Sequence, residues 1–223
     1  MGASDGPSST RVVVVDDQLA FAEAVALAIN TQDDLECVGL AGNIADALAM
    51  IEQHQPSVVL LDVHLPDGDG IEAVSRVKQR RPEANVVLLT ADEHTATVAR
   101  AAESGAAGFL QKTSPISAIL TAIRTASEGG MLVDPVTLSA IIQTLSATKS
   151  ERPSRLSRRG LTQREEEVLN LMGRGMDPAT IAKSLKITIS TARSHIKSIL
   201  AKLGVHSQLE AVITALREEL IER

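Results

Sequence analysis

Three carboxylates follow two short apolar runs in the first third of the chain. Val12–Val15 is followed directly by Asp16 and Asp17, and Val58–Leu61 is followed by Asp62. Apolar runs this short, bounded by Pro and Gly, are typical of buried parallel strands. The carboxyl ends of parallel strands lie at one edge of the sheet, where open α/β folds bind their ligands. We therefore expect the three carboxylates to lie at that edge.

Carboxylates that converge at one sheet edge repel one another and raise each other's pKa. A hard divalent cation with oxygen ligands is the usual means of holding such a cluster together. A carboxylate held beside that cation can attack a phosphorus centre and become an acyl phosphate. The acidic cluster is therefore a candidate metal site with phosphoryl-transfer chemistry.

Alternating strand-like and helix-like segments in the first 127 residues must position this cluster. The strand candidates are residues 11–16, 35–41, 57–61, 84–90 and 107–110, and the helical patterns are residues 18–30, 43–53, 69–80, 93–104 and 113–128. Five strand–helix units predict an α/β fold, a doubly wound five-stranded parallel sheet with helices on both faces. We expect this domain to span residues 11–128, after a disordered N-terminus of residues 1–10.

The segment after residue 128 has a different pattern. Asp134 and Pro135 are typical of a helix start, so we expect a helix near residues 134–146. Residues 147–160 are polar and basic and lack apolar periodicity, which is typical of a flexible connection. Residues 129–160 are therefore predicted to be a linker that contains one helix.

The remaining residues, 161–223, have a wholly helical pattern. They predict a separate all-α domain of four helices, the third at about 189–203 and the last at about 207–221. Charge divides the chain in a similar way, because residues 1–149 hold 9 Lys and Arg against 19 Asp and Glu, whereas residues 150–223 hold 13 against 9. A basic helical domain joined to an acidic domain predicts that the second domain binds a polyanion.

Composition argues against several other classes of protein. The chain has no Trp or Tyr, so it lacks the aromatic side chains on which single-stranded nucleic acids usually stack. Its one cysteine, Cys37, cannot form an internal disulfide. No apolar run reaches the roughly 18 residues of a membrane span, and the start of the chain has no signal-peptide pattern. These observations predict a cytoplasmic protein without membrane association.

Along nearly its whole length the chain resembles the NarL/FixJ group of two-component response regulators. The motifs typical of the receiver domain are Asp16-Asp17, the segment 60–70 around Asp62, Leu-Leu-Thr-Ala at 88–91 and Gly-Phe-Leu-Gln-Lys at 108–112. The motifs typical of the LuxR-type helix-turn-helix are Leu-Thr-Gln-Arg-Glu-Glu-Glu-Val-Leu at 161–169 and the segment 181–205. Each motif alone is unspecific, but together they occur in the family's order and spacing. The resemblance implies a flavodoxin-like receiver domain and a DNA-binding domain, hence a transcriptional regulator and not an enzyme.

The resemblance also implies roles for the acidic residues. Asp62 accepts a phosphoryl group from the phosphohistidine of a sensor histidine kinase. Asp17, Asp62 and the main-chain carbonyl of His64 are the ligands of Mg²⁺, and Asp16 holds a coordinated water. The metal lowers the negative charge on the acceptor and on the phosphoryl oxygens.

Three further receiver residues are implied to respond to the phosphoryl group. Lys112 pairs with the phosphate, and Thr90 turns its hydroxyl toward a phosphoryl oxygen. Phe109 is the switch aromatic, which rotates inward when Thr90 moves. The receiver is also expected to lose its phosphoryl group by its own slow hydrolysis.

The predicted helix at 189–203 resembles the second helix of a helix-turn-helix, which enters the major groove of DNA. Arg193, Ser194 and Lys197 share the face opposite its apolar side and are predicted to contact bases, with Arg193 the best suited to a guanine edge. The predicted phosphate contacts are Thr188, Thr191, His195, Lys202 and Lys183.

One helix-turn-helix covers half of a DNA site, so we expect a homodimer on pseudo-palindromic double-stranded DNA. In this family the last helix supplies the dimer contact. The residues predicted to form it here are Val205, Leu209, Val212 and Leu216.

Three other interpretations are possible from the sequence. A phosphorylation-independent DNA-binding regulator with a vestigial receiver would have the same second domain. An aspartyl-phosphate hydrolase would need a second carboxylate two residues after Asp62, where His64 stands. A stand-alone receiver that passes its phosphoryl group onward would have no use for a basic helical domain that binds DNA.

Overall fold

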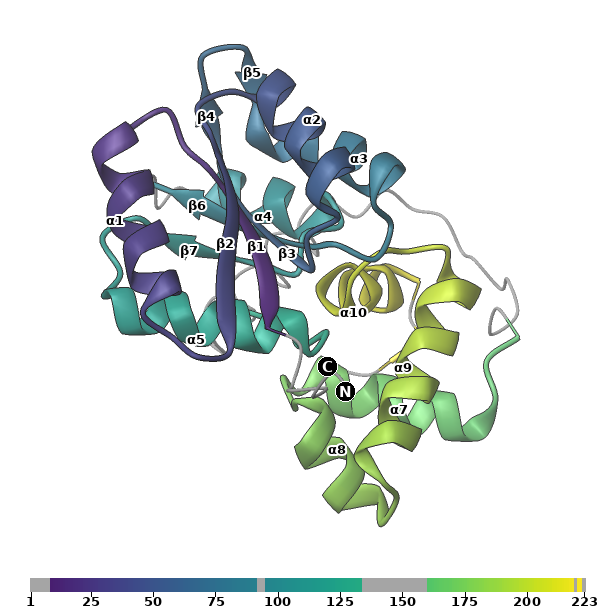
Figure 1. Ribbon diagram of the computed structural model, residues 1–223. Helices are drawn as coiled ribbons and strands as arrows, with labels where there is room; N and C mark the ends of the chain where they lie inside the picture. Colours follow the sequence, from purple (N-terminus) through teal and green to yellow (C-terminus); the bar gives the residue numbers. More distant parts are fainter. Residues whose placement is uncertain (1–8, 92–94, 134–159, 219, 222–223) are drawn as a thin grey trace. The chain divides into compact units, whose positions relative to one another are not determined.

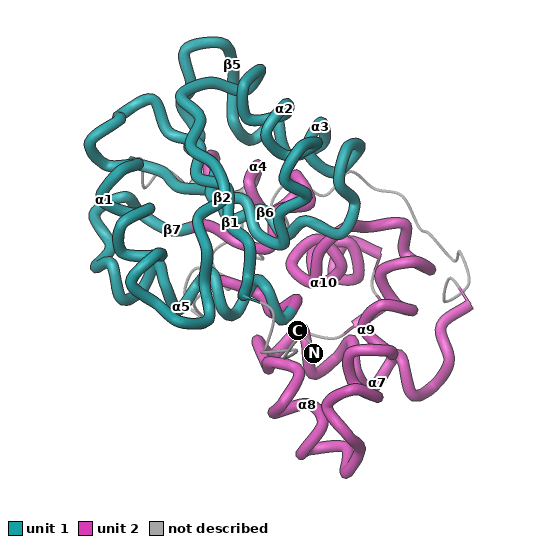
Figure 2. The backbone as a smooth tube through the Cα atoms, in the orientation of Figure 1, with its two compact units in different colours: residues 1–91, 110–128 teal, residues 92–109, 129–223 magenta. Residues whose placement is uncertain are grey.

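The computed structural model describes residues 9–91, 95–133, 160–218 and 220–221 (Figure 1). The predictions for most of the N-terminal segment, for the helix near 134–146 and for residues 147–159 lie outside these residues. The chain divides into two compact units, formed by residues 1–91 with 110–128 and by residues 92–109 with 129–223 (Figure 2).

A five-stranded parallel sheet forms the core of the N-terminal half. Its strands are β1 (Thr10–Val15), β2 (Leu35–Ala41), β3 (Val58–Asp62), β6 (Asn85–Thr90) and β7 (Gly108–Gln111). Their order across the sheet is β2-β1-β3-β6-β7, so the direction of winding reverses between β1 and β3. In such folds the crevice at the carboxyl ends of these two strands is the usual ligand site. The prediction of a doubly wound five-stranded sheet is confirmed.

Helices cover both faces of the sheet, which explains why its central strands β1, β3 and β6 contain continuous apolar runs. Helices α1 (Leu19–Asn30) and α5 (Ile116–Ser127) lie on one face, and α2 (Ile44–His54) and α3 (Gly70–Arg80) lie on the other (Figure 1). Helix α4 (Thr95–Glu103) precedes β7. Between β3 and α3 the chain forms a small antiparallel hairpin, β4 (His64–Leu65) and β5 (Gly68–Asp69), which the sequence analysis did not predict.

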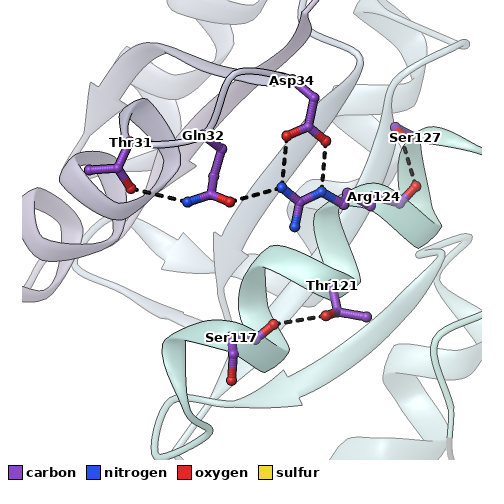
Figure 3. A network of polar contacts seen from close by, with 7 residues as sticks. All are labelled: Thr31, Gln32, Asp34, Ser117, Thr121, Arg124 and Ser127. Atoms are coloured by element: carbon purple, nitrogen blue, oxygen red, sulfur yellow. Dashed lines mark hydrogen bonds and ion pairs between the residues drawn. The ribbon is translucent and has the colours of Figure 1, made fainter.

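An exposed polar network connects α5 to the turn between α1 and β2 (Figure 3). The Arg124 guanidinium donates two hydrogen bonds of 2.7 Å to the Asp34 carboxylate and one of 3.0 Å to Gln32 Oε1. Hydrogen bonding to the guanidinium lowers the pKa of Asp34. Because water screens exposed ion pairs, the network contributes more to the orientation of α5 than to stability.

The C-terminal part contains helices α7 (Gln163–Gly173), α8 (Pro178–Leu185), α9 (Ile189–Leu203) and α10 (Gln208–Arg217). Helix α7 begins with a capping box, in which the side chains of Thr162 and Glu165 each accept a hydrogen bond from the other residue's backbone N–H. Asp177 caps α8 and Thr188 caps α9. Gly204 ends α9 in the left-handed region, with φ of 70°, as its residue type favours.

Helix α10 is shorter than the predicted helix at 207–221. It ends at Arg217, and the backbone N–H of Leu220 then donates to the carbonyl of Ala215. That bond joins residues five apart, whereas an α-helix joins residues four apart, so the α-helical pattern has ended there.

The helical domain has an aliphatic core that contains Val168, Leu169, Met172, Ile181, Ile199 and Leu203. In the described part of the chain, no single helix is long and apolar enough to cross a membrane. Only α9 and α10 taken together pass that test, across a bend of 54°.

Candidate functional site

Strands β1 and β3 bring the three predicted carboxylates together. Val15 pairs with Leu61, so Asp16 and Asp62 follow at adjacent strand ends. Oxygens of Asp16, Asp17 and Asp62 lie within 4.8 Å of one another. Asp16 and Asp62 are each 2% exposed, whereas Asp17 is exposed. The cluster is therefore buried on one side and open to solvent at Asp17.

The Lys112 ammonium lies at the same edge of the sheet. Its Nζ is 2.7 Å from Asp62 Oδ2 and 2.7 Å from Asp16 Oδ2. The backbone N–H of Lys112 donates to the carbonyl of Thr90 at 2.8 Å, which holds the residue beside the end of β6. Burial alone would lower the pKa of Lys112, but bonding to the two carboxylates outweighs burial and raises it. The ammonium balances one of the three carboxylate charges.

The surroundings of the Asp16 carboxylate give the clearest indication of a cation site. Its Oδ1 accepts a hydrogen bond of 2.9 Å from the Gln18 N–H. Its buried Oδ2 contacts Lys112 in a direction unsuited to a hydrogen bond, so this contact is mainly an ion pair. Burial raises the pKa of Asp16 more than Lys112 and the Gln18 N–H lower it. Three oxygen donors, one of them with unused acceptor capacity, fit a hard divalent cation.

The loop after β3 packs closely against Asp62. The His64 N–H donates to Asp62 Oδ1 at 3.2 Å, and the His64 ring is exposed. The Gly70 N–H donates to the Val63 carbonyl at 2.8 Å, and a Cβ at Gly70 would lie 1.9 Å from the carbonyl oxygen of Asp62. Asp67 accepts hydrogen bonds from the first N–H groups of α2 and so fixes the hairpin. The sequence analysis did not identify Gly70 or Asp67, although Asp-Gly pairs in this loop signalled a tight turn.

The two predicted switch residues lie in adjacent strands. Thr90 ends β6 and is 3% exposed, while Phe109 lies in β7 and is half-buried. The Phe109 N–H donates to the Leu132 carbonyl at 3.4 Å. Their roles in switching stay predictions.

Helix α9 presents a polar face to solvent. Arg193, Ser194 and Lys197 are exposed, whereas Ala192 and Ile196 are buried on the opposite side. Of the residues predicted to contact phosphates, Thr188, Thr191, Lys183 and Lys202 are exposed and His195 is half-buried.

A buried carboxylate to which the sequence assigned no functional role, that of Glu165, connects α7 to this helix. Glu165 is 4% exposed and accepts hydrogen bonds from Lys202 Nζ at 2.6 Å, Ser198 Oγ at 2.5 Å and the Thr162 N–H at 2.7 Å. Burial would raise the pKa of Glu165, but these bonds outweigh it and lower the pKa to about 2. The Lys202 ammonium therefore bonds to Glu165 within its own domain. The sequence had predicted only that Lys202 contacts a DNA phosphate.

We expect Glu165→Gln to destabilise the helical domain by about 2 kcal/mol at pH 7, because a neutral amide bonds less strongly than the buried carboxylate to Lys202, Ser198 and the Thr162 N–H. A folded-state pKa of about 2, below the ordinary 4.5, means that the carboxylate stabilises the fold above pH 4.5. That stabilisation is lost as the pH falls from 4.5 toward 2. Thermal unfolding followed by circular dichroism between pH 7 and pH 3 should show this loss in the wild type and not in the variant.

Glu167→Gln is the matched control for this prediction. Glu167 lies on the same helix and pairs with Arg164, but the two side chains are 41% and 36% exposed. Exposed pairs contribute little to stability, so this variant should unfold like the wild type. Equal stability of the Glu165 and Glu167 variants would contradict the role given to Glu165.

The four residues predicted to form a dimer contact differ in burial. Leu209 and Val212 are fully buried in the hydrophobic core that α10 shares with α7 and α9. Val205 and Leu216 are half-buried. Of these four residues, Val205 and Leu216 retain surface for contact with a second chain.

Comparison with known proteins relates both parts of the chain to characterised families. Residues 12–124 match the response regulator receiver domain, and residues 159–215 match the luxR family of bacterial regulatory proteins. The probable transcriptional regulatory protein NarL of Mycobacterium tuberculosis is 33% identical over 216 residues, which cover 97% of this chain and 98% of that protein.

Two solved structures show the same likeness. The receiver domain of NarL from Mycobacterium tuberculosis superposes with a TM-score of 0.53 at 36% identity, covering 55% of this chain and 99% of that one. The response regulator ChrA of a heme-sensing two-component system superposes with a TM-score of 0.50 at 28% identity, covering 96% of this chain and 100% of that one.

Proposed function

Because this chain belongs to the two-component response regulators that join a receiver domain to a LuxR-family DNA-binding domain, we propose that Asp62 is its phosphoacceptor and that phosphorylation controls its binding to DNA. The observation that carries the proposal is the buried Asp62 carboxylate, 2.7 Å from Lys112 and beside two further carboxylates. Receiver domains of this family take the phosphoryl group from the phosphohistidine of a sensor histidine kinase, which is therefore the proposed partner. In this proposal the receiver spans residues 11–128, the linker 129–160 and the DNA-binding domain 161–223.

Asp16, Asp17, Asp62 and the main-chain carbonyl of His64 would hold Mg²⁺, Asp16 through a water. When bound, the ion supplies positive charge that reduces repulsion between the carboxylates and an incoming phosphoryl group. Three carboxylates with oxygens within 4.8 Å of one another, beside a single Lys112 ammonium, support this assignment.

At Asp62, a carboxylate oxygen attacks phosphorus while the bond from phosphorus to the donor's imidazole nitrogen breaks. The product is an acyl phosphate, which carries about two negative charges where the free Asp62 carboxylate carried one. Lys112 then exchanges its Asp62 carboxylate partner for a phosphoryl oxygen. Hydrolysis of the acyl phosphate returns the receiver to its resting form.

Thr90 and Phe109 pass this change to the rest of the protein, Thr90 by turning its hydroxyl to the phosphoryl group and Phe109 by moving inward. The phosphorylated protein forms a homodimer through the exposed parts of Val205 and Leu216. Each chain then places α9 in a major groove, with Arg193, Ser194 and Lys197 at the bases. Phosphate contacts come from Thr188, Thr191, His195 and Lys183. This chemistry belongs in the cytoplasm, where the kinase's phosphohistidine and DNA are available.

A footprint across genomic DNA fragments, with and without acetyl phosphate and Mg²⁺, tests the proposal. We expect DNA sites to be protected only when the phosphodonor is present, or to be protected at about tenfold lower protein concentration when it is present than when it is absent. Protection that is equal in both conditions would favour a phosphorylation-independent regulator with a vestigial receiver.

A further inference from the structure

An aromatic ring lies against the ammonium at the proposed phosphorylation site. The Nζ of Lys112 is 5.5 Å from the centroid of the Phe21 ring, within the range of a cation–π interaction. Phe21 lies in the first turn of α1 and is half-buried, and the Lys112 side chain is 9% exposed. The ammonium therefore has a third neighbour besides the carboxylates of Asp16 and Asp62.

The same acidic cluster fixes the position of this ring. Asp16 Oδ1 accepts a hydrogen bond from the Gln18 N–H at 2.9 Å, and the Gln18 carbonyl accepts one from the Phe21 N–H at 3.0 Å. The start of α1 is thereby held on the carboxylate that also contacts Lys112. Phe21 is one of only two aromatic residues in a chain without Trp or Tyr.

Hydrogen bonds and cation–π attraction differ in their dependence on direction. A hydrogen bond from Lys112 to Asp62 requires one acceptor in one direction and is lost when that acceptor changes. Attraction to a ring face is spread over the whole face, and a ring also excludes water from one side of the ammonium. A cation–π interaction between Phe21 and Lys112 therefore persists while the ammonium moves from one anionic partner to another.

We propose that Phe21 is a positioning residue for Lys112, whose ring face holds the ammonium at the sheet edge while it moves from the Asp62 carboxylate to a phosphoryl oxygen. The inference rests on the proposed function of Asp62. It extends that function by assigning part of the rate of phosphoryl transfer to a residue that does not touch the reacting atoms.

The test replaces Phe21 in the full-length protein with a graded series of unnatural residues. Fluorinated phenylalanines with one, two and three fluorines weaken the negative ring face stepwise at nearly constant size, and cyclohexylalanine removes it while keeping the shape. The measurement is the rate of phosphoryl incorporation from acetyl phosphate at saturating Mg²⁺, resolved on phosphate-affinity gels. We expect the rate to fall with each fluorine and to be about two- to fivefold lower with cyclohexylalanine.

Two controls separate positioning from packing. The thermal unfolding midpoint should not follow the fluorine series, and the same residues at Leu27, an exposed position on α1, should leave the rate unchanged. The same ring series is also measured in the Lys112→Gln protein, whose residual rate of phosphoryl incorporation is followed over hours. That rate should be the same for every ring, because no ammonium faces residue 21.

The outcomes distinguish the inference from the function on which it rests. Equal rates for phenylalanine and cyclohexylalanine at residue 21, in a protein that is phosphorylated on Asp62, would overturn the inference alone. The same ring dependence with and without the Lys112 ammonium would also overturn it, because the ring would then act by packing. A wild-type protein that takes no phosphoryl group on Asp62 would overturn both.

Discussion

Asp62→Asn removes phosphoryl incorporation from acetyl phosphate, with a rate lower by about three orders of magnitude or more, because an amide is not a nucleophile toward phosphorus. The variant also loses any gain in DNA affinity on treatment with the phosphodonor. The fold should be retained, since Asn has the shape of Asp and can still accept a hydrogen bond from Lys112. Removing one of three adjacent negative charges reduces repulsion, so the unfolding midpoint should be equal to the wild type or higher.

Phosphate-affinity gels measure the phosphoryl labelling, and band-shift assays measure the affinity for DNA. Asp67→Asn is a matched control in the same loop, because Asp67 is exposed and caps α2 without joining the acidic cluster. It should be phosphorylated at a rate close to that of the wild type. Persistent labelling of the Asp62→Asn protein, with DNA affinity still responding to the phosphodonor, would show that another residue is the acceptor.

Gly70→Ala is expected to destabilise the receiver domain by about 3 kcal/mol or more and to slow phosphorylation strongly. A Cβ at this position would lie 1.9 Å from the carbonyl oxygen and 2.9 Å from the carbonyl carbon of Asp62. Both atoms belong to the backbone, so no side-chain rotation can relieve the overlap. The end of β3 or the start of α3 must shift, and a shift of β3 moves the Asp62 carboxylate relative to Lys112.

Urea unfolding of the full-length protein and the rate of labelling by acetyl phosphate measure these two effects. Gly42→Ala is the matched control, because the nearest atom to a Cβ there is the Asp16 carbonyl oxygen at 3.9 Å. That variant should have nearly wild-type stability and labelling. A Gly70→Ala protein that is as stable and as reactive as the Gly42→Ala protein would contradict the close packing of this loop against Asp62.

The sequence was sufficient to predict the five strands, the helices between them and the acidic cluster. The central strands β1, β3 and β6 are buried on both faces, so each contains an apolar run, and those of β1 and β3 end at the acidic residues. The caps at Thr162, Asp177, Thr188 and Gly204 were equally predictable, because a cap is formed by residues within one turn of each other. The motifs of the family could be identified for the same reason, since each is a short continuous segment.

Several side-chain contacts between distant residues were decided only by the tertiary structure. Glu165 bonds to Lys202 and Ser198 across more than thirty positions, and Lys112 meets both Asp62 and the Phe21 ring. Helical periodicity marked Leu209 and Val212 as apolar but could not decide between the core of their own domain and a second chain. Spacing along the chain determines which residues share a face of a helix or strand, whereas the partner of that face depends on which other elements pack against it.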